Sequence, residues 1–256
     1  MKVAVASDIH LEFGDIIIKN EENIDVLILS GDICVVKDID RPEKGSLVVD
    51  FFKRCSFQFP HVVYVMGNHE HYHGDFATSG VRIQRMIAEN HLNNIHFLDK
   101  ESVVINDVLF IGGTLWTDMN KEDPLTLMQI TRRMNDFQCV HNSNRQVTYS
   151  SMVPVIDTTI GGVKIGADGR PIYQKEFNTR DATFTPEDAV VDHKAMLKFL
   201  EETLKDNPPS RAVVVVGHHA PSKASTHPRY ARQTLMNGAY SSDLSEFILE
   251  IGRAHV

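Results

Sequence analysis

Four short polar clusters stand out in the chain, because each one opens or directly follows a strongly apolar run. They are Asp8-Ile9-His10, Gly31-Asp32, Gly67-Asn68-His69-Glu70 and Gly217-His218-His219. Carboxylate, imidazole and amide side chains are thereby delivered to the ends of predicted strands. This set of donor groups is suited to holding two divalent cations close together. A paired-metal site at strand ends is typical of phosphate-ester hydrolysis.

The four clusters differ in how specific they are. Asp8 and His10 lie two residues apart, so an extended backbone points both to the same side. Taken alone, this pair is better explained by a surface turn than by a metal site, and the Gly-Asp pair is a weaker signal still because it is common in turns. The third cluster is more specific, because Gly67 permits a tight exit from a strand and three polar residues follow at once. Paired histidines at the end of a buried strand, as in the fourth, are rarely a packing choice.

Apolar runs bounded by Gly, Asp or Asn predict five buried strands. They are Val3–Ala6, Val26–Leu29, Val62–Met66, Val108–Ile111 and Val213–Val216. Their richness in Val and Ile and their lack of alternation are typical of central strands covered on both faces. A shorter run at 103–105 is separated from 108–111 by Asn106-Asp107, which predicts a hairpin with a two-residue turn.

Helical patterns lie between the predicted strands. The clearest runs from Glu187 to about Lys205, where Thr185 is a predicted cap and Pro186 occupies the first helical position. Further helices are predicted at Ser46–Arg54, Thr78–Asn90 and Ser242–Leu249. Strands that alternate with helices indicate an α/β layered domain.

The segment 118–185 differs from the rest of the chain. It contains polar turns and one predicted hairpin, whose strands at 163–165 and 172–173 flank the turn Ala167-Asp168-Gly169-Arg170. We interpret it as an insertion without a hydrophobic core of its own. It shapes either substrate access or a subunit contact, and the sequence does not choose between the two.

Length and charge limit the classes of protein to consider. A chain of 256 residues favours one domain. The net charge of −8 argues against a protein that grips nucleic acid through a broad basic face. It does not exclude a nuclease that binds through metal ions, because two bound dications add local positive charge.

Cysteine usage and hydropathy indicate a cytoplasmic protein. The three cysteines are odd in number and lack C-x-x-C spacing, so they are interpreted as reduced thiols. No apolar stretch approaches the roughly 20 residues that a membrane span needs. The first apolar run reaches Asp8 too soon for the core of a signal peptide.

The ordered set D-x-H, G-D, G-N-H-E and G-H-H-A-P resembles the calcineurin-like metallophosphoesterase superfamily from Met1 to about Leu249. Phe110–Asp118 and Met134–Phe137 also resemble a bacterial and phage branch whose substrates are mostly unassigned. The resemblance implies a four-layer αββα fold, in which two β-sheets pack together and are flanked by helices. It also implies metals held by loops at the edge of the sheets.

Metal ligands follow from the same resemblance, position by position. Asp8 and His10 are expected to bind the first metal, and Asp32 to bridge both metals through its two carboxylate oxygens. Asn68 and His218 are expected to bind the second metal. Two divalent ions such as Mn, Fe or Zn are implied, and the sequence does not fix their identity. The other histidines near these motifs, among them His71, His73, His193 and His219, are not assigned as ligands.

One family motif has no match in this sequence. The family normally completes its site with G-H-x-H on a late strand, and no such motif occurs here. We therefore expect a chain truncated before that motif, with C-terminal strands missing and weakened metal affinity. Residues 250–256 are interpreted as a non-native read-through tail behind a single domain at 1–249, so His255 is not assigned as a ligand.

The chemistry implied is hydrolysis of a phosphate ester by a hydroxide that two metals share, with His69 protonating or stabilising the leaving oxygen. The expected substrate is a small phosphate ester or a nucleotide, monoester or diester. A nuclease or nucleotide pyrophosphohydrolase is the alternative, although nucleic acid is not favoured. A non-catalytic scaffold or an incompetent fragment of the same fold remains the third hypothesis. The sequence does not reveal the oligomeric state.

Overall fold

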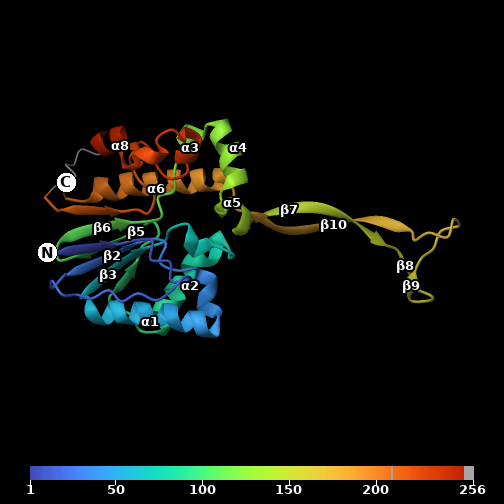
Figure 1. Cartoon of the computed structure of the whole chain (residues 1–256), viewed down its shortest axis with the longest axis horizontal. Helices are drawn as coiled ribbons and strands as arrows, with labels where there is room; N and C mark the ends of the chain where they lie inside the picture. The colour runs from blue at the N-terminus through green and yellow to red at the C-terminus, as the bar shows by residue number, and fades with distance from the viewer. Residues whose placement is uncertain (209, 251–256) are drawn as a thin grey trace. The chain divides into compact units, whose positions relative to one another are not determined.

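A computed structural model describes residues 1–208 and 210–250 and is drawn in Figure 1. The chain divides into two compact units. One comprises residues 1–141 together with those from 183 onward, and the other comprises 142–182. The predicted site residues all belong to the first unit, which is described first.

The first sheet has four parallel strands. They are β1 (Val3–Ala6), β2 (Val26–Ser30), β3 (His61–Val65) and β4 (Ile95–Phe97), in the spatial order β1-β2-β3-β4. Val3 pairs with Val26, and Val26 with His61, so the three polar loops that follow β1, β2 and β3 leave the sheet at the same edge. Parallel strands place their carboxyl ends together, which is why sequence-distant clusters meet there.

The second sheet has three strands in the order β11-β6-β5. They are β5 (Glu101–Ile105), β6 (Val108–Gly112) and β11 (Val213–Val216). The hairpin predicted around Asn106-Asp107 is confirmed, since Ile105 pairs with Val108 in antiparallel register. β11 runs parallel to β6, and its carboxyl end carries the Gly217-His218 cluster.

The two sheets pack face to face between helices, as Figure 1 shows for the first unit. Val26 and Ile28 of β2 face Phe110 and Val216 of the second sheet in one buried cluster. The alternate face of the first sheet packs on α1 (Pro42–Gln58) and α2 (Phe76–Glu89). The second sheet packs on α6 (Pro186–Asp206) and α8 (Ser245–Glu250). The predicted α/β fold of two sheets flanked by helices is confirmed.

The prediction that every apolar strand is covered on both faces is wrong for two of the five. β1 and β11 are the first strands of their sheets, and Val5 and Val215 are 67% and 41% exposed. β2 and β3 are central and fully buried apart from their end residues, as predicted. An unbroken apolar run does not reveal whether a strand lies at the centre or at the edge of its sheet.

Helix ends follow the local signals in the sequence. Thr185 and Asp188 form a capping box at the start of α6, with Oγ1 of Thr185 accepting from the backbone N of Asp188 at 3.3 Å. α1 begins at Pro42, earlier than predicted, because proline is accommodated at the first helical position. The predicted helix at Ser242–Leu249 is present as α8, which begins three residues later.

Several short elements complete the first unit. They are 3-10 helices η1 (Val36–Asp40), η2 (His69–His71), η3 (Lys223–Ser225) and η4 (Pro228–Tyr230), and helices α3 (Met119–Glu122), α4 (Pro124–Arg133), α5 (Asp136–Cys139) and α7 (Thr234–Asn237). Trp116, Ile130, Phe137 and Phe184 pack together in this region as a separate buried cluster. Residues 118–141, placed in the insertion by sequence, therefore contribute to the main unit.

The second unit is an extended hairpin. β7 (His141–Pro154) pairs with β10 (Tyr173–Thr183), and β8 (Ile156–Asp157) pairs with β9 (Gly162–Val163). The predicted turn is present, with Ile165 bridging Pro171 and Gly169 at φ +76°. Sequence reasoning missed β7, whose residues are mostly polar and exposed on both faces.

Two remaining expectations concern the ends and the membrane. Of the predicted tail at 250–256, Glu250 closes α8 and the remaining residues lie outside the described part of the chain. No helix within the described residues combines the length and the apolar character needed to cross a bilayer.

Candidate metal centre

Loops from both sheets bring the predicted ligands together around Asp32. Its Oδ2 lies 3.9 Å from Nε2 of His10 and 3.5 Å from Nε2 of His218. Nε2 of His10 is also 4.0 Å from Oδ1 of Asp8. Two atoms that each lie about 2.0–2.2 Å from one ion are separated by roughly 3–4 Å, so these spacings fit a shared cation. Asn68 joins them, with its Oδ1 3.2 Å from Nε2 of His218.

Two groups of donor atoms are each compact enough to hold an ion. One consists of Asp8, Asp32 and His218, and the other of His10, Asp32 and His69, with all donor atoms in a group within 4.8 Å of one another. Asp32 belongs to both groups, as a bridging carboxylate must. The second group includes His69, which the family resemblance places outside the ligand set. The same resemblance assigns Asp8 and His10 to one metal, whereas here they fall in different groups.

Three of the candidate ligands are held in a backbone conformation that costs energy. Asp8, His10 and Asp32 have φ values of 54°, 52° and 55°, in the left-handed region that non-glycine residues rarely adopt. Such residues cost of order 1–3 kcal/mol each and cluster at functional sites. Backbone hydrogen bonds hold them, since N of Asp8 donates to O of Gly31 and N of His10 to O of Asp32, at 3.1 and 3.0 Å.

Two glycines allow the loops to approach one another. Gly31 has φ +85°, and a Cβ there would clash with the imidazole of His218. A Cβ on Gly67 would overlap the carboxylate of Asp32. The glycine in each of these clusters is therefore required by the closeness of its neighbours as well as by the turn.

Glu70 is fully buried and ties the loops after β2 and β3 together. Its Oε2 accepts from the backbone N of Asp32 at 3.0 Å and of Gly67 at 2.8 Å. Its Oε1 accepts from N of Ile33 at 2.8 Å and from the hydroxyl of Tyr64 at 2.9 Å. The carboxylate of Glu70 thus accepts four hydrogen bonds, three of them from backbone N–H groups. Glu70 is therefore a positioning residue, and this role explains the glutamate of the G-N-H-E motif.

Glu12 is a site residue that sequence reasoning missed. Its Oε1 lies 3.1 Å from Nδ1 of His10 and 3.1 Å from Nδ1 of His69. A carboxylate on Nδ1 fixes the tautomer and leaves Nε2 as the free ligand or proton-transfer atom. The signal was available, because Glu12 follows His10 by the same two-residue step that separates His10 from Asp8.

His69 lies at the centre of these contacts. Its backbone N donates to Oδ1 of Asp32 at 2.9 Å, and its ring stacks on Tyr72 with centroids 4.0 Å apart. Burial alone would lower the pKa of His69, but the hydrogen bond to Glu12 and the charge of Asp32 outweigh it and raise that pKa. A raised pKa favours the protonated imidazolium, which is the form that can donate a proton.

Asp32 and His218 form a buried ion pair between the two sheets. Burial favours the neutral acid, yet the hydrogen bond and charge of His218 lower the pKa of Asp32 to about 2. Burial likewise works against the imidazolium, yet Asp32 raises the pKa of His218 to about 9. Binding a cation at Nε2 of His218 must therefore displace a proton.

His218 is oriented by the strand end of the opposite sheet. Its Nδ1 lies 2.9 Å from the backbone O of Ser30, which directs Nε2 toward Asp32 and Asn68. Oγ of Ser30 donates to O of Gly217 at 2.6 Å and adds a second tie between β2 and β11.

Asp136 and Tyr72 extend the network behind Asn68. The Tyr72 hydroxyl donates to Oδ2 of Asp136 at 3.1 Å, and Nδ2 of Asn68 lies 3.5 Å from the same hydroxyl. Asp136 is 2% exposed, and burial raises its pKa. The Met134–Phe137 motif thus reaches the site through Asp136, and Asn135 contributes to an adjacent hollow.

Three further histidines are structural. His71 contacts the rings of Phe76 and Trp116, and burial lowers its pKa to about 4. The ring of His219 stacks on that of Trp116 with centroids 5.0 Å apart, so we interpret His219 as a packing residue and not as a substrate contact. His193 is buried, with Nδ1 2.7 Å from the backbone O of Leu115.

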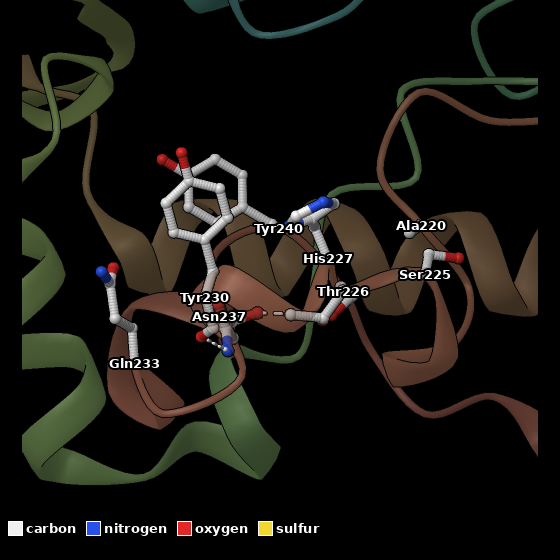
Figure 2. A pocket seen from close by; sticks show the side chains of 9 residues that line it. Ala220, Ser225, Thr226, His227, Tyr230, Gln233, Asn237 and Tyr240 are labelled. Atoms are coloured by element: carbon white, nitrogen blue, oxygen red, sulfur yellow. Dashed lines mark hydrogen bonds between the residues drawn. The ribbon is translucent and has the colours of Figure 1, made fainter.

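Two hollows lie near the site residues. One of about 650 Å³ is lined by Glu12 and His69 together with basic side chains and His73. The other, of about 430 Å³, begins at Ala220 directly after the paired histidines and is shown in Figure 2. Tyr230, Tyr240 and His227 line it, and Nδ2 of Asn237 donates to O of Tyr230 at 2.9 Å.

Comparisons with known proteins agree with this geometry. A family model described as calcineurin-like phosphoesterase matches residues 1–242. An uncharacterised protein, L509, of Acanthamoeba polyphaga mimivirus is 28% identical over 153 residues, covering 52% of this chain and 50% of that protein. The match thus spans about half the length of this curated relative.

A solved structure shares the fold. Phosphopantetheinyl hydrolase from Mycobacterium tuberculosis superimposes with a TM-score of 0.56 and 12% identity, covering 98% of this chain and 79% of that one. At this identity the likeness concerns the fold alone. With the family model matching most of the chain, the resemblance seen in the motifs is confirmed: this protein belongs to the calcineurin-like phosphoesterase family.

Proposed function

We propose that this protein hydrolyses a phosphate ester with the help of two divalent cations held around Asp32. The observation that carries the proposal is the position of its carboxylate, within 4 Å of both His10 and His218 and common to both donor groups. Asp8, His10, Asn68 and His218 are the remaining proposed ligands. The donor set of carboxylate, amide and imidazole suits Mn²⁺, Fe²⁺ or Zn²⁺.

The bound ions would supply an activated water and neutralise charge on the phosphate. Asp32 would hold both ions, and Glu12 engages Nδ1 of His10 and of His69, which leaves their Nε2 atoms available. His69 delivers a proton to the leaving oxygen, for which its raised pKa and its place beside Asp32 provide support. Only two of the proposed ligands are carboxylates, so a site loaded with two dications would carry a net positive charge. Such a site attracts an anionic ester.

The proposed substrate is a small phosphate ester or a nucleotide. We include the whole length 1–249 in one metallophosphoesterase domain, with the hairpin unit inserted in it. The name of the Mycobacterium tuberculosis neighbour suggests phosphopantetheinyl groups as one substrate class to include in a screen. Chromogenic phosphate monoesters and diesters, assayed with added Mn²⁺, test for the activity directly.

Replacing His69 distinguishes its two possible roles. We expect His69→Ala to lower turnover by roughly 10²–10⁴-fold, the usual share of a general acid, while bound metal measured by mass spectrometry stays unchanged. His91→Asn is the matched control, because His91 is exposed and has the positive φ of 55° that asparagine tolerates. Loss of metal from His69→Ala would instead make His69 a ligand with His10 and Asp32.

A further inference from the structure

The hollow beside His69 has a basic wall. Its cations are Lys37 of η1, Lys44 in the first turn of α1, and Arg41, which connects the two helices. We propose that this hollow receives the leaving group of the substrate and that this leaving group carries a negative charge of its own. The proposal rests on the phosphoesterase function above and narrows its substrate class to esters with a second anionic group, such as bisphosphates.

The position of the hollow connects it to the leaving group. His69 lines it, and η1 packs against η2, the 3-10 helix that begins at His69. A general acid must lie within hydrogen-bond reach of the oxygen that it protonates. Whatever is attached to that oxygen therefore extends past His69 into this hollow.

The carboxylates of the hollow do not cancel its cations. Asp38 is buried and accepts from both Arg41, at 2.7 Å, and Lys44, at 3.0 Å, so one carboxylate fixes two cations against the wall. Glu12 is taken up by the two histidines described above. Lys37 is exposed and forms no ion pair with any residue in the described ranges.

This local excess of positive charge is the reverse of the protein as a whole. The chain carries a net charge of −8, yet the wall next to the proposed general acid presents three cations. Basic side chains around a phosphate or carboxylate form charge-assisted hydrogen bonds, and these are stronger than neutral ones. An uncharged leaving group would leave Lys37 without an anionic partner among the described residues.

The lining of the hollow also offers an apolar contact. Phe13 lines the same hollow with 83% of its surface exposed, and its ring lies 5.9 Å from that of His10. A leaving group that fills about 650 Å³ can therefore place a carbon body against Phe13 and its anionic end against Lys37.

The test compares ligands that differ only in the second charge. Propane-1,3-diol bisphosphate and hexane-1,6-diol bisphosphate are titrated into Mn²⁺-loaded protein by calorimetry, alongside propyl and hexyl phosphate. We expect at least one bisphosphate to bind about 10-fold more tightly than its monophosphate partner, and Lys37→Glu to remove about 5- to 10-fold of that preference. Lys198→Glu, on the exposed face of α6, is the matched control and is expected to keep it.

The outcomes separate this proposal from the proposed function. Equal binding of bisphosphates and monophosphates, or an unchanged preference in Lys37→Glu, would overturn the assignment of the hollow even if the chromogenic esters are hydrolysed. If no ester is hydrolysed but bisphosphates still bind more tightly in a way that depends on Lys37, the charged subsite is supported and the catalytic function is rejected. Circular dichroism of the variant confirms its fold, and Lys37→Ala provides a milder change at the same position.

Discussion

The two sheets contribute very unequally to the candidate metal centre. Loops after β1, β2 and β3 provide Asp8, His10, Asp32 and Asn68, whereas the second sheet provides only His218. The first group is cross-linked by Glu70, Glu12 and backbone hydrogen bonds. The single residue of the second sheet is held by two backbone carbonyls, that of Ser30 at its Nδ1 and that of Thr114 at its backbone N. One sheet thus builds a preorganised half-site, and the other completes it.

This difference has a physical origin in the strand arrangement. β1, β2 and β3 are neighbours in one parallel sheet, so hydrogen-bonded register alone fixes where their loops meet. β11 belongs to another sheet, and its place depends on side-chain packing between Val26, Ile28, Phe110 and Val216. Register is a directional constraint, whereas apolar packing is not. The second half of the site is therefore expected to be the more easily displaced.

The largest effect is expected from the residue that both donor groups share. Asp32→Ala removes the common carboxylate, so we expect loss of both ions and a decrease in phosphoesterase activity of about 10³-fold or more, equivalent to over 4 kcal/mol. Metal content and turnover are measured on the same sample. Asp107→Asn, in the exposed turn between β5 and β6, is the control. Retention of two ions by Asp32→Ala would show that the two groups do not share a ligand.

Removing the contribution of the second sheet should have a smaller and more selective effect. In His218→Ala, we expect one of the two ions to be lost and activity to fall by about 10- to 100-fold, because Asp8, His10 and Asp32, the ligands proposed for the other ion, all follow strands of the first sheet. Titration with Mn²⁺ gives the stoichiometry. If both ions are lost, the first sheet does not hold an ion alone and the proposed asymmetry is wrong.

A substitution that loosens the loops of the first sheet tests whether those loops are preorganised. Glu70→Gln keeps the shape but places an NH₂ group against backbone N–H donors of Asp32 and Gly67 or of Ile33. We expect a loss of about 1–3 kcal/mol in the free energy of unfolding, the cost of a buried unsatisfied donor. Urea unfolding of the metal-free protein measures it. An unchanged midpoint would mean that Glu70 does not hold these loops.

The asymmetry also explains what the sequence could predict. Asp8, His10, Asp32 and Asn68 follow apolar runs directly, so their position at the ends of strands was predictable from the chain alone. The roles of Glu70 and Glu12 were not, because a carboxylate beside a histidine fits a ligand as well as a partner for backbone or ring N–H groups. Only the distances to Gly67 and to Nδ1 of His69 distinguish them.

Tertiary packing also determined several features that periodicity does not encode. His219 and His218 are adjacent in sequence, yet one stacks on Trp116 and the other faces Asp32. The His-His dipeptide by itself does not indicate which of the two histidines packs and which faces Asp32. The exposed face of β1 and the pairing of the polar strand β7 were likewise missed, since propensity reports local preference and not the neighbours that a strand acquires.

The smallest expected effect concerns the pH dependence of the ion pair that joins the two sheets in the metal-free protein. The pKa of His218 is raised from 6.5 to about 9, so its stabilising contribution is complete below pH 6.5 and lost as the pH rises through 9. The pKa of Asp32 is lowered from 3.8 to about 2, so its contribution is complete above pH 3.8 and lost only in stronger acid. The pair is therefore fully formed in mildly acidic solution.

Comparing wild type with His218→Gln in the presence of a chelator isolates this pair from other titrating groups. We expect the wild type to be more stable by about 1–3 kcal/mol near pH 5.5, the range for a hydrogen bond to a charged group, and the difference to shrink toward zero near pH 9.5. Urea unfolding at both pH values gives the two differences. A difference that does not change with pH would mean that the charge of His218 contributes nothing to joining the sheets, and that Asp32 is positioned entirely by the first sheet.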